Sequence, residues 1–514
     1  MKALVYCCLF ACLLLAGGWP LYAQTIVQGP AFGAMTHQSA KVYLRTLKPA
    51  TLKIEWTADS LFTTVNSTVG QSRQLLDNSV ILSITGLQPD TKYYYRLFAD
   101  GVQDTITAWF RTFPAPGQRG DFTFVTGSCQ ETENMKVFNA IPLNQPYFLL
   151  HTGDFTYPDY QIAPDYSAHY QKIAYSYQKK YDEKVMKQML HTIPIDYIYD
   201  DNDYVGGSGG RYVKDYNSQN SMLFFNTENK IWTDSFPDFW RGNCIKGYMD
   251  FFPGYEMVDT SNGIFHSFKF GNAEFFFLDR CANTPHGNSY GFKWDGKRKK
   301  FTYEPADDHV LFGKVQMDWL KNGLKNSTAD WKFIVSGVPL NRNIQILINA
   351  GLRLQNIGWK DNNGFRLATG FTQYWAGHPA EINDFYDWLG KENVKDIVVI
   401  SGDTHHNVMD DGRNAGLPEL NASGMSVTET YLAYYLKVIG NITGQFNLKK
   451  QVWNQGGQGF GNRNFKNGFG KVRIVNNEYV ELAIIDEDNE LVSSFKVNHS
   501  STPKGARHQK KLNY

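Results

Sequence analysis

The sequence feature that most limits the possible folds is a predicted buried strand that ends in a turn with several potential metal ligands. Residues 397–400 read Ile-Val-Val-Ile, and such a β-branched run is typical of a strand inside a sheet. A Ser-Gly pair ends this strand, and Asp403, His405 and His406 lie on the turn that follows. Open α/β sheets bind ligands beyond the carboxyl ends of their strands. The stretch therefore predicts an α/β fold. It leaves two interpretations of the turn open: a metal site, or a loop whose histidine is held by hydrogen bonds.

Three further predicted strands, at 122–126, 147–150 and 193–199, end in turns of the same kind. These turns carry Cys129, then Asp154 and Tyr157, then Asp200, Asp201 and Asn202. Each has an ordinary explanation by itself: a small core cysteine, a helix cap, a core tyrosine or a solvated acidic turn. Three carboxylates within residues 200–203 repel one another unless a cation lies among them. Because the pattern recurs at successive strand ends, we predict that these side chains surround shared metal ions at one edge of a sheet.

The 514-residue chain is long enough for two or three domains. Residues 24–113 alternate apolar and polar positions and include a turn that feeds a tyrosine-rich strand, which predicts an immunoglobulin- or fibronectin-like β-sandwich. Residues 114–120 contain prolines and glycines and predict a linker. Residues 121–498 alternate strands with helical pieces, as an α/β domain does, and include a predicted hairpin across residues 265–278. Residues 499–514 form a polar tail.

Residues 1–23 are typical of a signal peptide, because Lys2 precedes an apolar run at 4–16 that is too short to span a bilayer. We therefore expect an exported protein, periplasmic or secreted, with no transmembrane segment after the signal is removed. A lipoprotein cut at Cys12 is the alternative. The mature chain would keep Cys129, Cys244 and Cys281, and a Cys244–Cys281 disulfide would leave Cys129 free for another role.

The charges of the chain balance, with 51 basic and 50 acidic residues. Such a balance excludes a general attraction of the whole protein to nucleic acid or to membranes. We therefore expect no specific nucleic-acid ligand, and the oligomeric state stays open.

Six motifs occur in order along the chain: Gly-Ser-Cys-Gln, Gly-Asp-x-x-Tyr, Asp-Asp-x-Asp-Tyr, Leu-Asp-Arg, Gly-x-x-Gln-x-x-Trp-Leu and Ser-Gly-Asp-x-His. This ordered set resembles the alkaline phosphatase D family, calcineurin-like metallophosphatases related to purple acid phosphatases. The resemblance runs from about residue 29 to about residue 485. It implies an αββα metallophosphatase sandwich with metals held at the strand ends, behind the N-terminal β-sandwich.

The resemblance also implies a role for each motif residue. It implies that a thiolate and a phenolate bind Fe(III) and that carboxylates bind a divalent cation. Fe(III) is a hard cation that favours phenolate and carboxylate, and carboxylate oxygens suit calcium. Calcium is the first choice for the divalent cation, with zinc, manganese and magnesium as alternatives. The metal-ligand positions are Cys129 and Tyr157 on iron, Asp154 as the bridge, Asp201 and Asp403 on the divalent side, and His405 as the imidazole ligand.

The sequence departs from the family pattern at two places that bear on catalysis. Asn202 stands where the family usually has a histidine, and asparagine cannot act as a general acid. His406 could replace that acid. Arg280 could approach the substrate phosphate, although it lies one residue before the usual arginine position, where Cys281 stands. The glycine-rich stretch 206–210 is either a mobile loop or a backbone cradle for phosphate.

The expected function is an exported, metal-dependent phosphatase that hydrolyses small phosphate monoesters, with diesters as a second option. The expected chemistry is attack of a metal-bound hydroxide on phosphorus. Two alternatives stay open. One is a metal-binding but catalytically weakened protein, because of Asn202. The other is a glycan-binding module attached to a hydrolase, because 15% of the residues are aromatic.

Overall fold

A computed structural model describes residues 26–158, 169–204, 238–281, 291–354, 368, 370–426, 440–441, 448–458 and 466–499. The predicted signal peptide, the glycine-rich stretch 206–210 and residues 500–514 of the predicted tail lie outside this range. None of the described helices has the length and apolar character needed to cross a bilayer.

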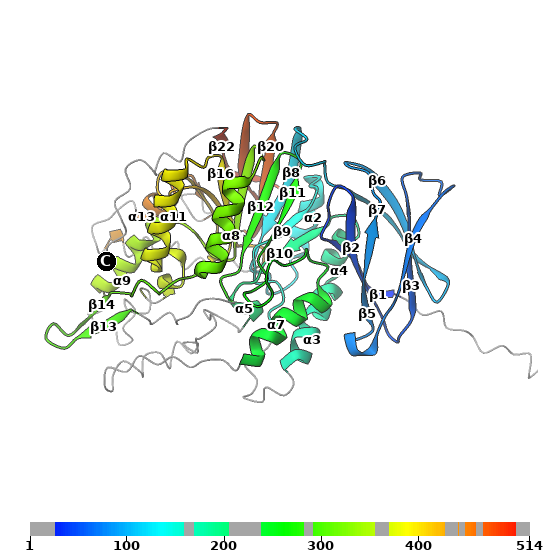
Figure 1. The fold of residues 1–514 in the computed structure, drawn as a ribbon, viewed down its shortest axis with the longest axis horizontal. Helices are drawn as coiled ribbons and strands as arrows, with labels where there is room; N and C mark the ends of the chain where they lie inside the picture. Colours follow the sequence, from blue (N-terminus) through cyan, green and yellow to red (C-terminus); the bar gives the residue numbers. More distant parts are fainter. Residues whose placement is uncertain are drawn as a thin grey trace, which may run out of the picture.

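The N-terminal part consists of two antiparallel sheets, shown in blue in Figure 1. Alternate residues are buried along the tyrosine-rich strand at 92–99, as the predicted alternation requires. Phe32, Tyr95 and Phe110 meet between the sheets, with ring centroids 4.8–6.2 Å apart. One sheet has the order β1 (Ile26–Gly33), β2 (Ser39–Thr46), β5 (Ser79–Thr85), and the other β4 (Asn66–Gln71), β3 (Thr51–Thr57), β6 (Lys92–Ala99), β7 (Val102–Arg111). The immunoglobulin- or fibronectin-like type and the domain bounds stay predictions.

The first large sheet combines strands from both ends of the remaining chain. Its parallel strands β8, β9 and β10 are joined by three C-terminal strands that run antiparallel to β8 or to one another. The order is β10 (Ile195–Tyr197), β9 (Leu149–His151), β8 (Asp121–Gly127), β20 (Gly468–Val475), β21 (Tyr479–Asp486), β22 (Leu491–Asn498).

The second large sheet lies face to face with the first (Figure 1). The predicted hairpin across 265–278 is confirmed, with His266 paired to Phe277 and Phe270 to Ala273. The predicted strand at 397–400 is also confirmed and lies in the middle of this sheet. The order is β11 (His266–Phe270), β12 (Ala273–Leu278), β15 (Trp331–Ser336), β16 (Ile397–Ser401), β18 (Pro418–Ala422), β17 (Asn407–Asp411), β19 (Gly456–Gly457).

Aromatic rings fill the space between the two large sheets. Phe124 of the first sheet lies 5.2 Å from Phe275 and 5.4 Å from Phe333 of the second, measured between ring centroids. Phe148, next to β9, stacks on Phe124 at 4.9 Å. These rings have a structural role, because large rings bury much apolar area in a sheet-on-sheet interface.

Helices cover the outer faces of the two sheets in Figure 1, so the fold is a mixed α/β sandwich. Helices α3 and α4 also contact β1 of the N-terminal part. The helices near the first sheet are α2 (Met135–Leu143), α3 (His169–Asp182), α4 (Lys184–Leu190), α5 (Asp201–Tyr204) and α7 (Asp238–Phe251). The other elements are α8 (Gly313–Asn326), α9 (Gln345–Leu354), α11 (Pro379–Glu392), α13 (Leu448–Val452), the 3₁₀ turns η1 (Gln74–Leu76), η3 (Arg342–Ile344) and η4 (Trp375–Gly377), and the strand pair β13 (Phe292–Asp295) and β14 (Lys300–Tyr303).

All three cysteines in the described part of the chain are free thiols, so the Cys244–Cys281 disulfide considered from the sequence is not formed. Cys244 instead donates to the backbone oxygen of Tyr204 over 3.3 Å. Helix α7 places Cys244 against α5, whereas Cys281 follows β12.

Candidate metal centre

The turns predicted from the sequence meet at one end of the two large sheets. Strands β8, β9 and β10 are parallel and in register, with Gly127 and Tyr197 both paired to His151. Their following turns therefore lie side by side at the same sheet edge. Strand β16 of the facing sheet brings the Asp403–His405 turn to the same place.

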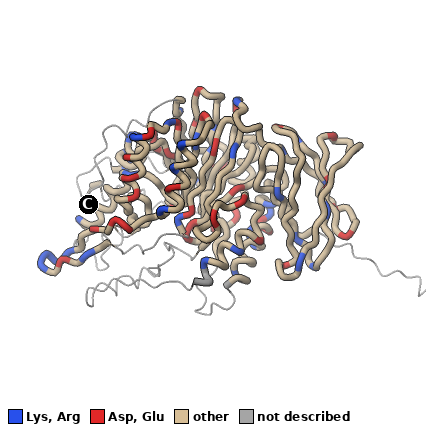
Figure 2. The backbone as a smooth tube through the Cα atoms, in the orientation of Figure 1, with Lys and Arg blue, Asp and Glu red and all other residues tan. Residues whose placement is uncertain are grey.

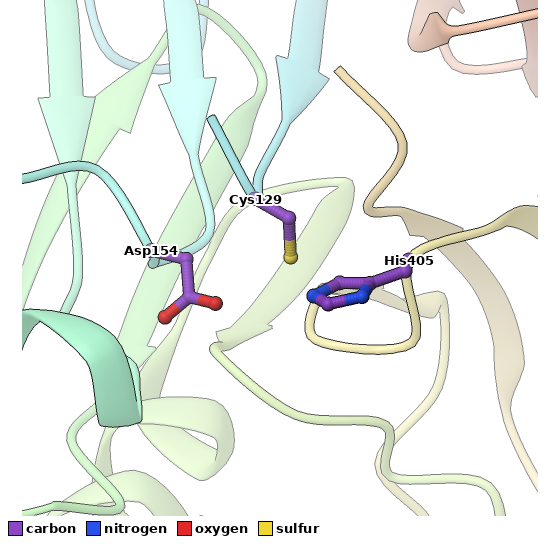
Figure 3. Close-up of side chains that lie close together, drawn as sticks. All are labelled: Cys129, Asp154 and His405. Carbon is purple, nitrogen blue, oxygen red and sulfur yellow. The ribbon is translucent and has the colours of Figure 1, made fainter. Parts of the chain in front are cut away.

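Six of these side chains form two groups that share one carboxylate. Cys129, Asp154 and His405 each offer a ligand atom, and these atoms lie within 4.8 Å of one another. In Figure 3 the three side chains point toward a common space. A second group satisfies the same limit and consists of Asp154, Asp200, Asp201 and Asp403. Because Asp154 belongs to both groups, the geometry suits a carboxylate that bridges two cations.

Several residues of this centre adopt left-handed backbone conformations. Cys129, Asp154, Tyr157, Asp403 and His405 have φ values of 58°, 55°, 44°, 71° and 54°. A non-glycine residue in this region costs on the order of 1 kcal/mol or more, and such residues cluster at functional sites. The surrounding structure must therefore hold each turn in place.

Tyr157 lies beside the first group. Its hydroxyl donates to Oδ2 of Asp154 over 3.2 Å. Burial, reinforced by Asp154 and Cys129, raises the pKa of the Tyr157 phenol above its ordinary value. Burial and Asp154 likewise raise the pKa of the Cys129 thiol. Both groups would ionise only with a cation beside them, and thiolate and phenolate are ligands suited to a transition metal.

The second group is a set of carboxylates removed from water. Asp154, Asp200 and Asp201 are buried, and Asp403 is half-buried. Burial raises the pKa of Asp154 and of Asp200 well above the ordinary value, and raises the pKa of Asp201 to about 7. Neighbouring carboxylates add to each shift, because like charges disfavour ionisation. The donor set thus fits bound cations, which would offset this repulsion.

Arg280 is placed inside the acidic group. Its guanidinium forms an ion pair with Asp200 and lies 3.5 Å from Oδ1 of Asp201. The side chain is 2% exposed. Arg280 therefore lies near the predicted metal ligands, where one of its functions is to balance the charge of Asp200; its predicted approach to substrate stays a prediction.

Asn202 contacts the shared carboxylate directly. Its backbone N–H donates to Oδ1 of Asp154 over 3.0 Å, and its side-chain amide donates to Oδ2 over 2.9 Å. Asn202, at the position where the resemblance leads us to expect a histidine, thus orients Asp154.

The structure gives His406 a buried position, with its ring hydrogen-bonded to the backbone. The imidazole is buried, and Nδ1 lies 2.6 Å from the backbone oxygen of Thr404. Burial lowers the pKa of His406 to about 4, so the ring is neutral near pH 7. This placement gives the proposed acid role no support.

Asp203 is a functional residue that the sequence interpretation did not single out. It is buried and accepts hydrogen bonds from the backbone N–H groups of Asp154, Phe155 and Thr156, over 2.7, 2.8 and 2.7 Å. It also accepts from the N–H of Asp200 over 3.1 Å. One carboxylate therefore ties together the turns that follow β9 and β10. Its place in the Asp-Asp-x-Asp motif was the available signal.

The Cys129 turn is held from the outer side of the first sheet. Lys180 of α3 donates to the backbone oxygen of Gln130 and pairs with Glu183 over 2.9 Å. The side-chain amide of Gln130 also donates to Glu183. The N–H groups of Cys129 and Gln130 donate to the oxygens of Gly153 and Asp154, over 3.2 and 3.0 Å. The buried Lys180–Glu183 pair therefore fixes the turn that presents the thiol.

A buried polar network supports the Asp403–His405 turn. Asn421 of β18 donates to the oxygen of Gly402 over 2.6 Å and accepts from the hydroxyl of Thr404 over 2.6 Å. Glu419, on the same strand, accepts from Ser401 over 2.6 Å and from the N–H of Leu340 over 3.0 Å. A further contact comes from Gln373, whose amide donates to Asp403 over 3.4 Å. Gln373 lies outside any strand, so no sequence pattern marked it.

Comparisons with known proteins bear on the fold and the family. The fold is similar to a solved structure of PhoD, with a TM-score of 0.64 at 18% identity over 94% of this chain and 92% of that one. It is also similar to the purple acid phosphatase PPD1 from yellow lupin (Lupinus luteus) seeds, with a TM-score of 0.53 at 11% identity over 93% and 74% of the two chains. These likenesses define the class of fold.

Residues 122–432 match the family model described as PhoD-like phosphatase, and the chain belongs to this family. Alkaline phosphatase D of Bacillus subtilis (strain 168) is 24% identical over 342 residues, which cover 64% of this chain and 54% of that protein. The chain thus spans about half the length of this curated relative. The predicted resemblance to the alkaline phosphatase D family is confirmed.

Replacing Asp203 by asparagine should destabilise the centre. In either orientation, the amide NH₂ would face two backbone N–H donors where a carboxylate oxygen now accepts: those of Asp154 and Asp200, or those of Phe155 and Thr156. We expect a loss of about 2–3 kcal/mol in the free energy of unfolding, measured by urea denaturation in a metal chelator. Asp259→Asn is the matched control, because Asp259 accepts a backbone hydrogen bond from Ser261 in an exposed turn. Equal losses in the two variants would contradict the assignment.

Glu419 should make the stability of the protein depend on pH. Burial raises its pKa from 4.5 to about 8, so the folded protein holds a proton on Glu419 that the unfolded chain releases above about pH 4.5. The free energy of unfolding should therefore fall as pH rises from 4.5 to 8, by about 2 kcal/mol between pH 5.5 and 7.5.

The variant Glu419→Gln should lose this part of the pH dependence, whereas Glu478→Gln, at an exposed residue, should keep it. Urea denaturation at both pH values measures the difference. If the free energy of unfolding changed with pH in the same way in wild type and Glu419→Gln, Glu419 would not be the source of the pH dependence.

Proposed function

We propose that this protein is a metal-dependent phosphoric ester hydrolase that acts on small phosphate monoesters, with diesters as a second substrate class. The observation that carries the proposal is the shared Asp154 carboxylate. It joins a Cys-Asp-His group to a group of four aspartates, each within 4.8 Å. A bridging carboxylate between two sets of ligands is what a two-metal hydrolytic site needs.

The residues of the two groups divide by chemistry. Cys129, Tyr157 and His405, with Asp154, would hold Fe(III). Asp201 and Asp403, with Asp154, would hold the divalent cation, for which calcium is our first choice. Asp200 lies close enough to add a further oxygen. When bound, the two ions would polarise a phosphate oxygen and lower the pKa of a water molecule.

The side chains around the ions would orient the reaction without supplying a strong acid. Asn202 donates to Asp154 and cannot release a proton, and His406 is neutral at pH 7. The leaving group must then depart with little help from these two residues. Aryl esters, whose leaving groups are weak bases, should be hydrolysed faster than alkyl esters.

A second candidate is a metal-binding protein with weakened catalysis. The replacement of the family histidine by Asn202 is the observation that favours it. We further propose export through residues 1–23, a division near residues 114–120, and an immunoglobulin- or fibronectin-like type for the N-terminal sheets. The antiparallel order of those sheets supports the last point.

Elemental analysis together with turnover of an aryl phosphate and an aryl phosphodiester tests the main proposal. The purified protein should contain iron and a divalent metal and should hydrolyse at least one ester. Asp154→Asn should lower kcat/KM by more than about 100-fold and reduce the content of both metals, because Asp154 belongs to both groups. Asp259→Asn should leave both unchanged. Wild-type protein without metal and without turnover would refute the proposal.

Asn202→His separates the two candidate functions. If Asn202 weakens catalysis, histidine should raise kcat for an alkyl phosphate by about 100-fold or more and change kcat for an aryl phosphate much less. If the site is adapted to asparagine, the alkyl rate should change little or fall. The alkyl-to-aryl ratio of kcat is the measurement that decides.

A further inference from the structure

The β13–β14 hairpin carries a concentration of positive charge that the net charge of the chain conceals. Residues 292–303 contain five basic residues and one acidic residue, whereas the whole chain has a net charge of +1. The hairpin projects from the body at the lower left of Figure 1, and Figure 2 shows its basic residues in blue. Exposed on it are Lys293, Lys297, Arg298 and Lys299.

Most of this charge is not neutralised locally. Lys293 pairs with Glu304 over 3.0 Å, and Arg298 lies 3.7 Å from Asp295. Within the described residues, no carboxylate lies in ion-pair distance of the side chains of the other three, Lys297, Lys299 and Lys300. The tip therefore presents a positive potential to solvent.

An exposed tryptophan accompanies the basic residues. Trp294 is 42% exposed, and its ring lies 4.9 Å from that of Phe301. The hairpin thus presents an exposed part of an aromatic ring beside its basic side chains. At the interface of a lipid bilayer, the same ring finds its preferred environment, while the basic side chains meet anionic headgroups.

The base of the hairpin is anchored. Phe292 and Tyr303 are buried, and their rings lie 4.7 Å apart. The hydroxyl of Tyr303 donates to the backbone oxygen of Gly377. These contacts fix the hairpin to the body of the protein, so a surface bound at the tip would hold the whole protein.

We propose that this hairpin docks the protein on an anionic lipid surface. A projecting, convex tip reaches a flat surface, whereas binders of single-stranded nucleic acid follow the strand in a groove with several stacking aromatics. Each basic residue at such a surface strengthens binding by about fivefold. The inference is independent of the proposed hydrolysis, because none of the residues of the metal centre takes part.

Vesicle sedimentation of the full chain tests the proposal. The protein should bind phosphatidylglycerol/phosphatidylcholine vesicles more tightly than phosphatidylcholine vesicles, and 0.5 M NaCl should remove the difference. The variant Lys297→Gln/Arg298→Gln/Lys299→Gln should lose the phosphatidylglycerol-dependent affinity by about 100-fold. Trp294→Ala should lose about tenfold.

The matched control removes three exposed charges elsewhere. Lys314 and Lys325 lie on α8 and Lys391 on α11, and their joint change to glutamine should keep the wild-type affinity. All variants share one N-terminus, so any binding through the apolar residues 4–16 would be common to them and independent of phosphatidylglycerol.

Three outcomes would overturn the proposal: no phosphatidylglycerol-dependent binding, equal losses in the hairpin and control variants, or binding of a single-stranded oligonucleotide through the hairpin without vesicle binding. Circular dichroism and urea denaturation serve as the folding check, since neither measurement depends on the proposed hydrolysis.

Discussion

The repulsion among buried carboxylates is the constraint on which the metal centre depends. Asp154, Asp200 and Asp201 are buried, and their acidic oxygens lie within 4.8 Å of one another and of Asp403. Such a cluster is stable only if charge is balanced by cations, by protonation or by hydrogen bonds. Arg280 supplies one fixed positive charge beside Asp200. The remaining negative charge would favour the binding of cations.

Close backbone approach lets the carboxylates meet. A Cβ added to Gly153 would lie 2.3 Å from Cβ of Asp200, and Gly153 has a φ of +97°. A Cβ on Gly402 would lie 2.6 Å from Oγ of Ser128 and from the oxygen of Thr152. Any larger residue would push the turns apart. Asp203 then holds the turns that follow β9 and β10 through four backbone hydrogen bonds.

The predicted ligands were accessible from sequence because each directly follows a strand. A strand pattern and a glycine or aspartate turn place Cys129, Asp154 and Asp403 without knowledge of the fold. Gln373 and Lys180 could not be found in this way. They act through contacts with residues 30 and 50 positions away, and such contacts exist only after the layers pack. The basic hairpin was not predicted from the sequence for another reason. The net charge sums all residues and therefore hides a local cluster of basic residues.

The sequence by itself determined the α/β class, the predicted ligands and the presence of asparagine at position 202, where the resemblance implies a histidine, because these depend on local pattern and residue chemistry. Tertiary structure alone decided that Arg280 pairs with Asp200, that Lys180 holds the Cys129 turn, and that Cys244 and Cys281 stay apart. Each of these depends on the distance between elements that lie far apart in the sequence. Strand order and sheet packing set that distance, and neither is encoded in a local run of residues.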